Sequence, residues 1–163
     1  MFIERKWEMP HRYTFRMKTV AALLADEMRG QWADPFAGET SPASVTNDAD
    51  ESRPTVYHSD GLDFLKQHAD ESFDGVLFDP PYSCEQALRK YKPVQNGTAG
   101  RAEYWAKCKD EIARIVKRGG KVICFGWDST GIGKKRGFEL QRVLLLCHGA
   151  CHNDTIVTVE TRL

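Results

Sequence analysis

The chain has 163 residues, of which 41% are hydrophobic and 28% are charged, and this length suits one compact domain over residues 1–163. Lys plus Arg and Asp plus Glu each number 23. A formal net charge of zero excludes a global positive field that would draw the protein onto nucleic acid or an anionic membrane. Five cysteines, an odd number, are typical of reduced thiols, and the sequence has neither a signal-peptide pattern nor a membrane-length apolar run. We therefore expect a cytoplasmic protein that binds any polyanion through a local patch.

Hydrophobic spacing predicts helices and strands that alternate along the chain. Apolar residues three and four positions apart predict an amphipathic helix over Met17–Met28, stopped by Gly30. The same spacing predicts a second helix over 105–115, ended by Gly119–Gly120, and Asp60 can cap a short helix between the two. The predicted strands, in chain order, are 32–34, 43–47, 56–58, 75–78, 121–125, 138–146 and 155–161. The alternation predicts an α/β fold, with a mostly parallel twisted sheet, helices on both faces and a C-terminal antiparallel hairpin.

One predicted connection is too short for an ordinary crossover. Residues 35–43, which include two prolines and a glycine, separate the first two parallel strands. A parallel crossover normally needs about a dozen residues or more and usually contains a helix. Either this helix has shrunk to a turn or one strand is misassigned. The chemistry of the residues at both ends favours a shortened first crossover.

The strongest chemical pattern, Asp79-Pro80-Pro81-Tyr82, follows the buried strand 75–78. Ligands of open α/β sheets collect beyond the carboxyl ends of the strands, and two prolines fix the backbone there. Asp79 and the Pro80 carbonyl can accept both hydrogens of an exocyclic amino group while Tyr82 stacks on a planar base. Accepting these hydrogens localises the nitrogen lone pair and makes it nucleophilic. The alternative is a plain Pro-Pro turn after a core strand.

At these residues the sequence resembles the amino-group DNA methyltransferases, most often those that act on adenine N6. Asp79-Pro80-Pro81-Tyr82 is similar to their catalytic motif. Asp34-Pro35-Phe36-Ala37-Gly38 resembles their S-adenosylmethionine motif, and 13–20 resembles the additional cofactor motif on the preceding helix. The three motifs occur in the family's order over nearly the whole chain. The resemblance implies a Rossmann-like class I methyltransferase fold, S-adenosylmethionine as cofactor, and double-stranded DNA with a flipped adenine as substrate.

The resemblance also assigns roles to individual residues. Phe36 would flank the cofactor, Gly38 would let the backbone approach it, and Asp48 would bind the ribose hydroxyls. Asp60 would contact the adenine amino group of the cofactor. The further cofactor-binding residues implied by the motifs are Thr14, Phe15, Lys18, Asp34, Pro35, Ala37, Gly61 and Leu62. Each has a simpler alternative: Asp48 as a turn former, Asp60 as a helix cap, and Phe15 as a core residue.

The sequence departs from the family pattern after Gly38, at Thr19, where a proline is usual, and in the target-recognition region. No second glycine and no helix follow Gly38, so the carboxylate of the methionine part needs another partner, for which Lys18 is a candidate. The family's target-recognition region of many tens of residues has no counterpart except the segment 83–103, which we expect either as a mobile substrate loop or as a solvated linker. Recognition would then be short or loose, or supplied by a homodimer or another subunit.

Two basic clusters are candidate phosphate contacts. They comprise Arg89, Lys90, Lys92 and Arg101 in the segment 83–103, and Lys134, Lys135 and Arg136 in a loop expected at the same sheet edge as Asp79. Such contacts give affinity without sequence information.

A Cys-His cluster is the main competing pattern, made of Cys147, His148, Cys151 and His152. Structural zinc sites usually take ligand pairs from two separate elements, whereas these four lie in one predicted hairpin turn. We therefore expect no metal. The remaining alternatives to an adenine-N6 enzyme are a cytosine-N4 or ribosomal RNA amino-methyltransferase and a non-catalytic DNA-binding subunit.

Overall fold

The computed structural model describes residues 1–81, 98–149 and 152–163. Its strands are β1 (Phe2–Trp7), β2 (Trp32–Asp34), β3 (Val45–Thr46), β4 (Phe73–Phe78), β5 (Val116–Gly126), β6 (Phe138–Cys147) and β7 (Thr155–Arg162). Its helices are α1 (Lys18–Glu27), α2 (Gly61–Lys66) and α4 (Thr98–Ile115), with short 3-10 turns η1 (Thr14–Arg16) and η2 (Lys134–Arg136). The expected alternation of strands and helices is confirmed.

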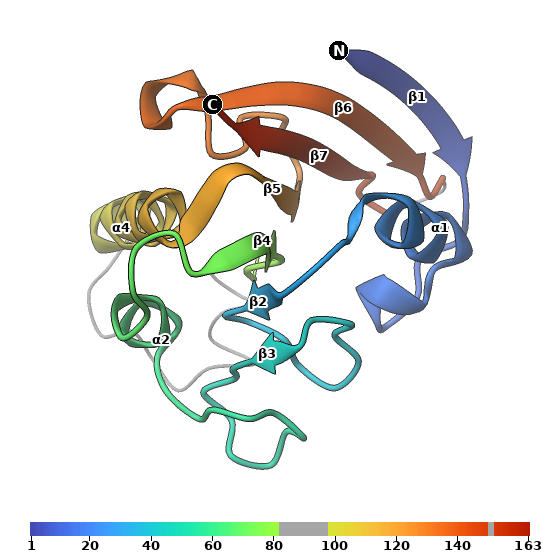
Figure 1. Cartoon of the computed structure of the whole chain (residues 1–163). Coiled ribbons are helices and arrows are strands. Elements are labelled where there is room, and N and C mark those ends of the chain that lie inside the picture. Colours follow the sequence, from blue (N-terminus) through green and yellow to red (C-terminus); the bar gives the residue numbers. More distant parts are fainter. Residues whose placement is uncertain (82–97, 150–151) are drawn as a thin grey trace.

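The seven described strands form one sheet in the order β1-β6-β7-β5-β4-β2-β3 (Figure 1). Neighbours from β5 to β3 are parallel, and β7 runs antiparallel to both β5 and β6. This confirms the mostly parallel sheet and the C-terminal hairpin. Because β2, β4 and β5 are parallel, the residues that follow them meet at one edge, which we call the carboxyl edge.

Helices cover both faces of the sheet (Figure 1). Val20, Leu23 and Leu24 of α1 pack with Trp32 and Leu77 on one face. On the other face α2 and α4 pack over β4 and β5 through the buried residues Phe64, Leu65, Ile112, Ile115, Val76 and Val122. Burying this apolar surface is the main driving force for folding and holds the carboxyl edge rigid.

The first crossover is shortened, as the sequence predicts. β2 and β3 pair in parallel although residues 35–44 between them contain no helix. Serines hold this connection in place. Ser44 accepts the Trp32 N–H at 3.2 Å and donates to the Trp32 carbonyl at 3.1 Å, and Ser41 donates to Asp34 at 2.6 Å.

Two local expectations are wrong. Residues 56–58 do not form a strand, since only an isolated bridge joins Tyr57 to Asn47. In place of the backbone hydrogen bonds of a strand pair, the buried side-chain amide of Asn47 donates to the Pro35 and Ser59 carbonyls. Gly119–Gly120 does not end a helix. These glycines lie inside β5, where the pairing with β4 shifts register.

The sequence analysis makes no prediction for β1. β1 pairs in parallel with β6 at the sheet edge, and Phe2, Ile3 and Trp7 are exposed there. An exposed edge strand lacks the buried alternation by which strands are recognised in a sequence. None of the helices in the described part of the chain combines the length and apolar character needed to cross a membrane.

Candidate active site

Asp79, Pro80 and Pro81 follow β4 at the carboxyl edge and line an open cleft of about 450 Å³, here called the first cleft. Its other walls come from the segment before α1, the loop after β2 and the loop after β3. Nine residues implied by the sequence line it together: Thr14, Phe15, Phe36, Ala37, Gly38, Asp48, Asp79, Pro80 and Pro81. The first cleft therefore brings the two main sequence motifs face to face.

Asp34 lies behind the first cleft and is completely buried at the end of β2. Its carboxyl group accepts the Phe36 N–H at 2.9 Å and the Ser41 hydroxyl at 2.6 Å. Burial raises its pKa to about 7, and the neighbouring charges of Asp79 and Asp48 push in the same direction while the two hydrogen bonds oppose it. The cleft is thus built on a cluster of three carboxyl groups.

Asp48 joins the two loops that form one wall of the first cleft. It is 4% exposed, and its two oxygens accept the Gly38 N–H at 3.0 Å and the Asp50 N–H at 2.9 Å. These bonds fix the Gly38 turn relative to the loop after β3. Asp48 also lines the cleft.

Asp60, Gly61 and Leu62 do not line the first cleft. Asp60 caps α2 by accepting the Leu62 and Asp63 N–H groups, and it also accepts the Tyr104 hydroxyl at 3.0 Å. The ring of Phe36 lies so close to Gly61 that a Cβ there would be 2.5 Å from ring atoms. These residues support the cleft wall, and the helix-cap alternative describes Asp60 in this structure.

The segment before α1 supplies the rim of the first cleft. The Tyr13 hydroxyl donates to Glu39 at 2.5 Å, and Glu39 pairs with Arg53, which also pairs with Asp50 at 3.1 Å. Arg12 lines the cleft with its guanidinium 4.6 Å from the centre of the Tyr13 ring.

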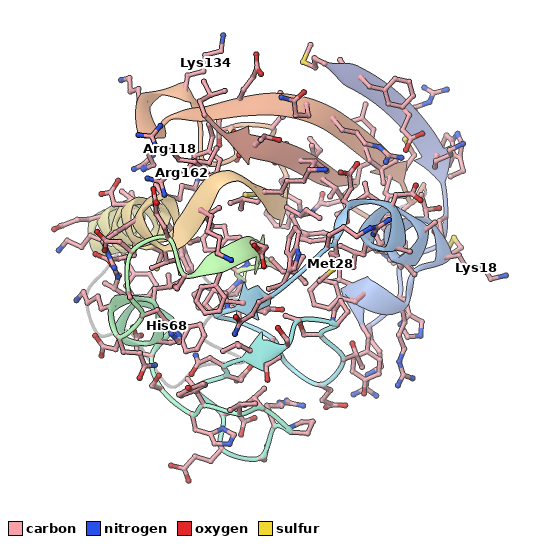
Figure 2. All side chains as sticks on the ribbon, viewed as in Figure 1. Lys18, Met28, His68, Arg118, Lys134 and Arg162 are labelled. Atoms are coloured by element: carbon pink, nitrogen blue, oxygen red, sulfur yellow. The ribbon has the colours of Figure 1, made fainter. Side chains whose placement is uncertain are left out.

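Lys18, expected at the methionine end of a cofactor, does not line the first cleft. Its side chain points away from the protein beyond α1 (Figure 2). Its backbone N–H donates to the Glu8 carboxylate at 2.6 Å. Arg12 was not among the residues predicted from the sequence. Its place two residues before Thr14 could have identified it as a residue of the cleft.

A second cleft of about 210 Å³ lies on the other side of the same turn. It shares Pro80 and Pro81 with the first cleft, and its further lining includes Phe78, Trp105, Lys109, Cys124, Phe125, Gly126, Trp127, Asp128, Thr130 and Gly131. Sequence reasoning missed this wall. Trp127 follows β5 as Asp79 follows β4, and that equivalence was the available signal. The Pro80-Pro81 backbone therefore separates two hollows that both open at the carboxyl edge.

Comparisons with known proteins show to which fold the chain belongs. TrmN from Thermus thermophilus superposes on 90% of the chain with a TM-score of 0.57 and 17% identity, over 49% of its own length. A Burkholderia thailandensis 1,6-didemethyltoxoflavin-N1-methyltransferase, solved with bound 1,6-didemethyltoxoflavin and S-adenosylhomocysteine, superposes on 87% of the chain with a TM-score of 0.60 and 10% identity, over 75% of its own length. The chain has the Rossmann-like class I methyltransferase fold.

Sequence similarity is more limited than the similarity of fold. The type II methyltransferase M.BamHI from Bacillus amyloliquefaciens is 29% identical over 70 residues, which is 43% of this chain and 16% of that protein. No protein-family model matches the chain. The chain spans about half of TrmN and a sixth of M.BamHI.

Several predicted site residues lie outside the part of the methyltransferase fold that the structure describes. These residues are Tyr82, Arg89, Lys90 and Lys92. Of the segment 83–103, residues 98–103 belong to the start of α4, which includes the backbone of Arg101. The expectation of a loop over these six residues is therefore wrong, because they are helical.

The second basic cluster lies at the wrong edge of the methyltransferase fold. Lys134, Lys135 and Arg136 form η2 directly before β6, and the start of β6 pairs with the end of β7. Lys134 lies near Arg118 and Arg162 (Figure 2). Because β6 runs in the same direction as β4, the start of β6 lies at the edge opposite Asp79. The expected shared edge is incorrect because the connection after β5 crosses the whole height of the sheet before η2 begins.

The side chain of Arg136 binds other groups of the protein. Its guanidinium pairs with Asp110 at 2.6 Å and donates to the Ala106 and Ile132 carbonyls at 3.3 Å. This side chain anchors η2 to α4.

His148 of the Cys-His cluster is buried and holds the hairpin turn. Its ring nitrogens lie 2.6 Å from the Glu8 carbonyl and 2.9 Å from the Thr155 hydroxyl. Cys151 lies outside the described residues. Among the residues that are described, no three His, Cys, Asp or Glu side chains are grouped to hold a metal ion.

Proposed function

We propose that this domain transfers a methyl group from S-adenosylmethionine to the exocyclic N6 of adenine in DNA. The observation that carries the proposal is the rigid Asp79-Pro80-Pro81 turn between two clefts, because one donor and one acceptor site must meet at a single point for group transfer. The order of the sequence motifs and the partial similarity to a type II methyltransferase favour this class of substrate.

The first cleft suits the cofactor in size and chemistry. A cleft of about 450 Å³ falls in the range of ligand sites. Asp48 offers carboxylate oxygens to a ribose diol, and Phe36 offers an aromatic face. Asp48 and Asp79 line the cleft, and their negative charges favour a positive charge in it. When bound, S-adenosylmethionine supplies an electrophilic methyl group on a sulfonium centre.

The methionine end of the cofactor calls for a cation at the cleft rim. Arg12 is such a cation, and a guanidinium can hold a carboxylate through two parallel hydrogen bonds. This assignment replaces Lys18, whose side chain points into solvent.

The second cleft suits the target base. Four aromatic residues, Phe78, Trp105, Phe125 and Trp127, contribute to its walls, and Trp127 is 45% exposed. A flipped base entering there brings its amino group to Asp79 and the Pro80 carbonyl, and Tyr82 is expected to stack on the ring.

The residues at the turn would act by orientation. Asp79 and the Pro80 carbonyl accept the two N–H hydrogens, so the nitrogen lone pair leaves conjugation and points toward the first cleft. The new N–C bond forms as the S–C bond breaks, S-adenosylhomocysteine remains, and the methylated nitrogen then loses one proton. Proximity and alignment account for most of the acceleration.

The test is methyl transfer from labelled S-adenosylmethionine to unmethylated genomic DNA at low salt. We expect N6-methyladenine in the digested product by mass spectrometry. No incorporation into any DNA would overturn the proposal, whereas N4-methylcytosine or a labelled RNA would keep the chemistry and change the substrate.

A matched pair of variants tests the role of the turn. Asp79→Asn removes the charge that accepts an amino hydrogen and should lower kcat at least about 100-fold. Asp63→Asn, the same change at an exposed position of α2, should leave kcat unchanged. S-adenosylhomocysteine affinity, measured by calorimetry, should change by less than about threefold in both variants.

A further inference from the structure

Glu160 is a carboxylic acid in the buried part of β7. It is only 2% exposed, and Val157 and Val159 of the same strand belong to the core. Burying a carboxyl group is unfavourable unless hydrogen bonds replace its water. At this position the replacement comes from the backbone of a distant loop.

Both carboxyl oxygens of Glu160 accept backbone N–H groups from the connection after β5. Oε2 accepts from Ile132 at 2.5 Å and Oε1 accepts from Gly133 at 2.9 Å. This two-pronged contact fixes both the position and the orientation of the loop above the sheet.

The loop passes directly over the carboxyl group. A Cβ at Gly131 would lie 2.2 Å from Oε2, and Gly131 has a φ of +53° that other residues rarely adopt. The missing Cβ at Gly131 therefore lets the loop lie against the Glu160 carboxyl group. A side chain at position 131 would push the loop away from this carboxyl group.

The anchored loop forms a wall of the second cleft. Trp127, Asp128, Thr130 and Gly131 line that cleft opposite Pro80 and Pro81, and none of these four lines the first cleft. A displacement of the loop would therefore change the second cleft and leave the first one intact.

We propose that Glu160 is the positioning residue for the target-base site: through the backbone of residues 131–133 it sets the distance between Trp127 and the Pro80-Pro81 turn. This assignment rests on the proposed function, because it takes the second cleft as the place where the base docks. Glu160 acts through the loop and contacts no substrate itself.

The first test is kinetic. Glu160→Gln keeps the size of the side chain, but its amide NH2 cannot accept one of the two N–H groups. We expect the KM for DNA to rise about tenfold while kcat falls less than about threefold. S-adenosylhomocysteine affinity should stay within about twofold. Glu139→Gln, the same change at an exposed position of β6, is the control and should alter none of these values.

The second test does not depend on methylation of DNA. Acrylamide quenching of Trp127 fluorescence, obtained by subtracting the signal of Trp127→Phe, should increase about twofold in Glu160→Gln. Gly131→Ala should give the same increase, and it serves as the alternative variant if Glu160→Gln does not fold. A failure of the proposed function would abolish DNA methylation in the wild type and still leave this readout.

Two results would overturn the assignment. Unchanged Trp127 quenching in both variants would mean that the loop holds its place without the carboxyl group. An equal loss of affinity for DNA and for S-adenosylhomocysteine would mean that Glu160 supports the whole fold and has no selective effect on the second cleft.

Discussion

At the scale of single residues, the pKa of Asp34 depends on the charge of the first cleft. Burial raises its pKa to about 7, and the charges of Asp79 and Asp48 add to this effect. Ionisation of Asp34 beside these two carboxyl groups is therefore unfavourable. A bound cation would reverse the effect, because it stabilises the ionised carboxylate.

This shift predicts a pH-dependent stability for the protein without cofactor. The folded protein keeps the Asp34 proton up to about pH 7, whereas the unfolded chain releases it near 3.8. Stability is therefore lost as the pH rises between these values. Relative to wild type, Asp34→Asn should gain about 2–3 kcal/mol of unfolding free energy between pH 5 and pH 8, measured with urea. A difference that stays constant with pH would show that Asp34 titrates normally.

At the scale of elements, the start of α1 is capped from a distance. The Glu8 carboxylate, which follows β1, accepts the Lys18 N–H at 2.6 Å and the Thr19 N–H at 2.9 Å. Partial burial raises the pKa of Glu8, but these hydrogen bonds and the Lys18 charge outweigh it and lower the pKa below its usual value. The cap fixes the segment between β1 and α1, where Thr14 and Phe15 line the first cleft.

Removal of this cap should destabilise the protein modestly. Glu8→Gln should cost about 1 kcal/mol of unfolding free energy at pH 7, because a neutral amide accepts helix N–H groups less well. The lowered pKa means that the difference is present above pH 4.5 and disappears as the pH falls through the folded-state value. Urea unfolding at pH 7 and pH 3 measures it, with Glu51→Gln on an exposed turn as the control. An undiminished difference at pH 3 would contradict the assignment of charge to the cap.

Elements that bury an apolar face were predictable from the sequence, and those held by single polar side chains were not. β4 and α1 carry unmistakable hydrophobic patterns, and the short crossover follows from the count of residues between β2 and β3. The bridge at Tyr57 depends on the buried amide of Asn47, which no periodicity reveals.

The same distinction holds at the site. The motif residues of the first cleft were predictable because each adjoins a recognisable strand or helix. The second cleft was not predictable, because the loop that forms its wall is held by Glu160, which lies near the C-terminal end of the sequence. Hydrogen bonds between distant segments leave no local trace in a sequence.

At the scale of the whole molecule, both clefts open at the carboxyl edge, while the basic turn η2 lies at the opposite edge. With DNA as the proposed substrate, local patches would decide where the DNA lies, because the chain carries equal numbers of acidic and basic residues. DNA that delivers a base to Asp79 must pass along the carboxyl edge. Lys134 and Lys135 can then reach only phosphates far from the target.

This geometry predicts that Lys134 and Lys135 are dispensable for a short substrate. A duplex of about twelve base pairs is only about 40 Å long and has its target base near the middle. The double variant Lys134→Ala/Lys135→Ala should methylate it with a KM within about twofold of wild type, because only side chains that bind phosphates of the duplex strengthen its binding at low salt. Steady-state methylation at several salt concentrations checks both the KM and its salt slope. A large rise in KM with a shallower slope would mean that the DNA reaches η2, and the path along the carboxyl edge would have to be abandoned.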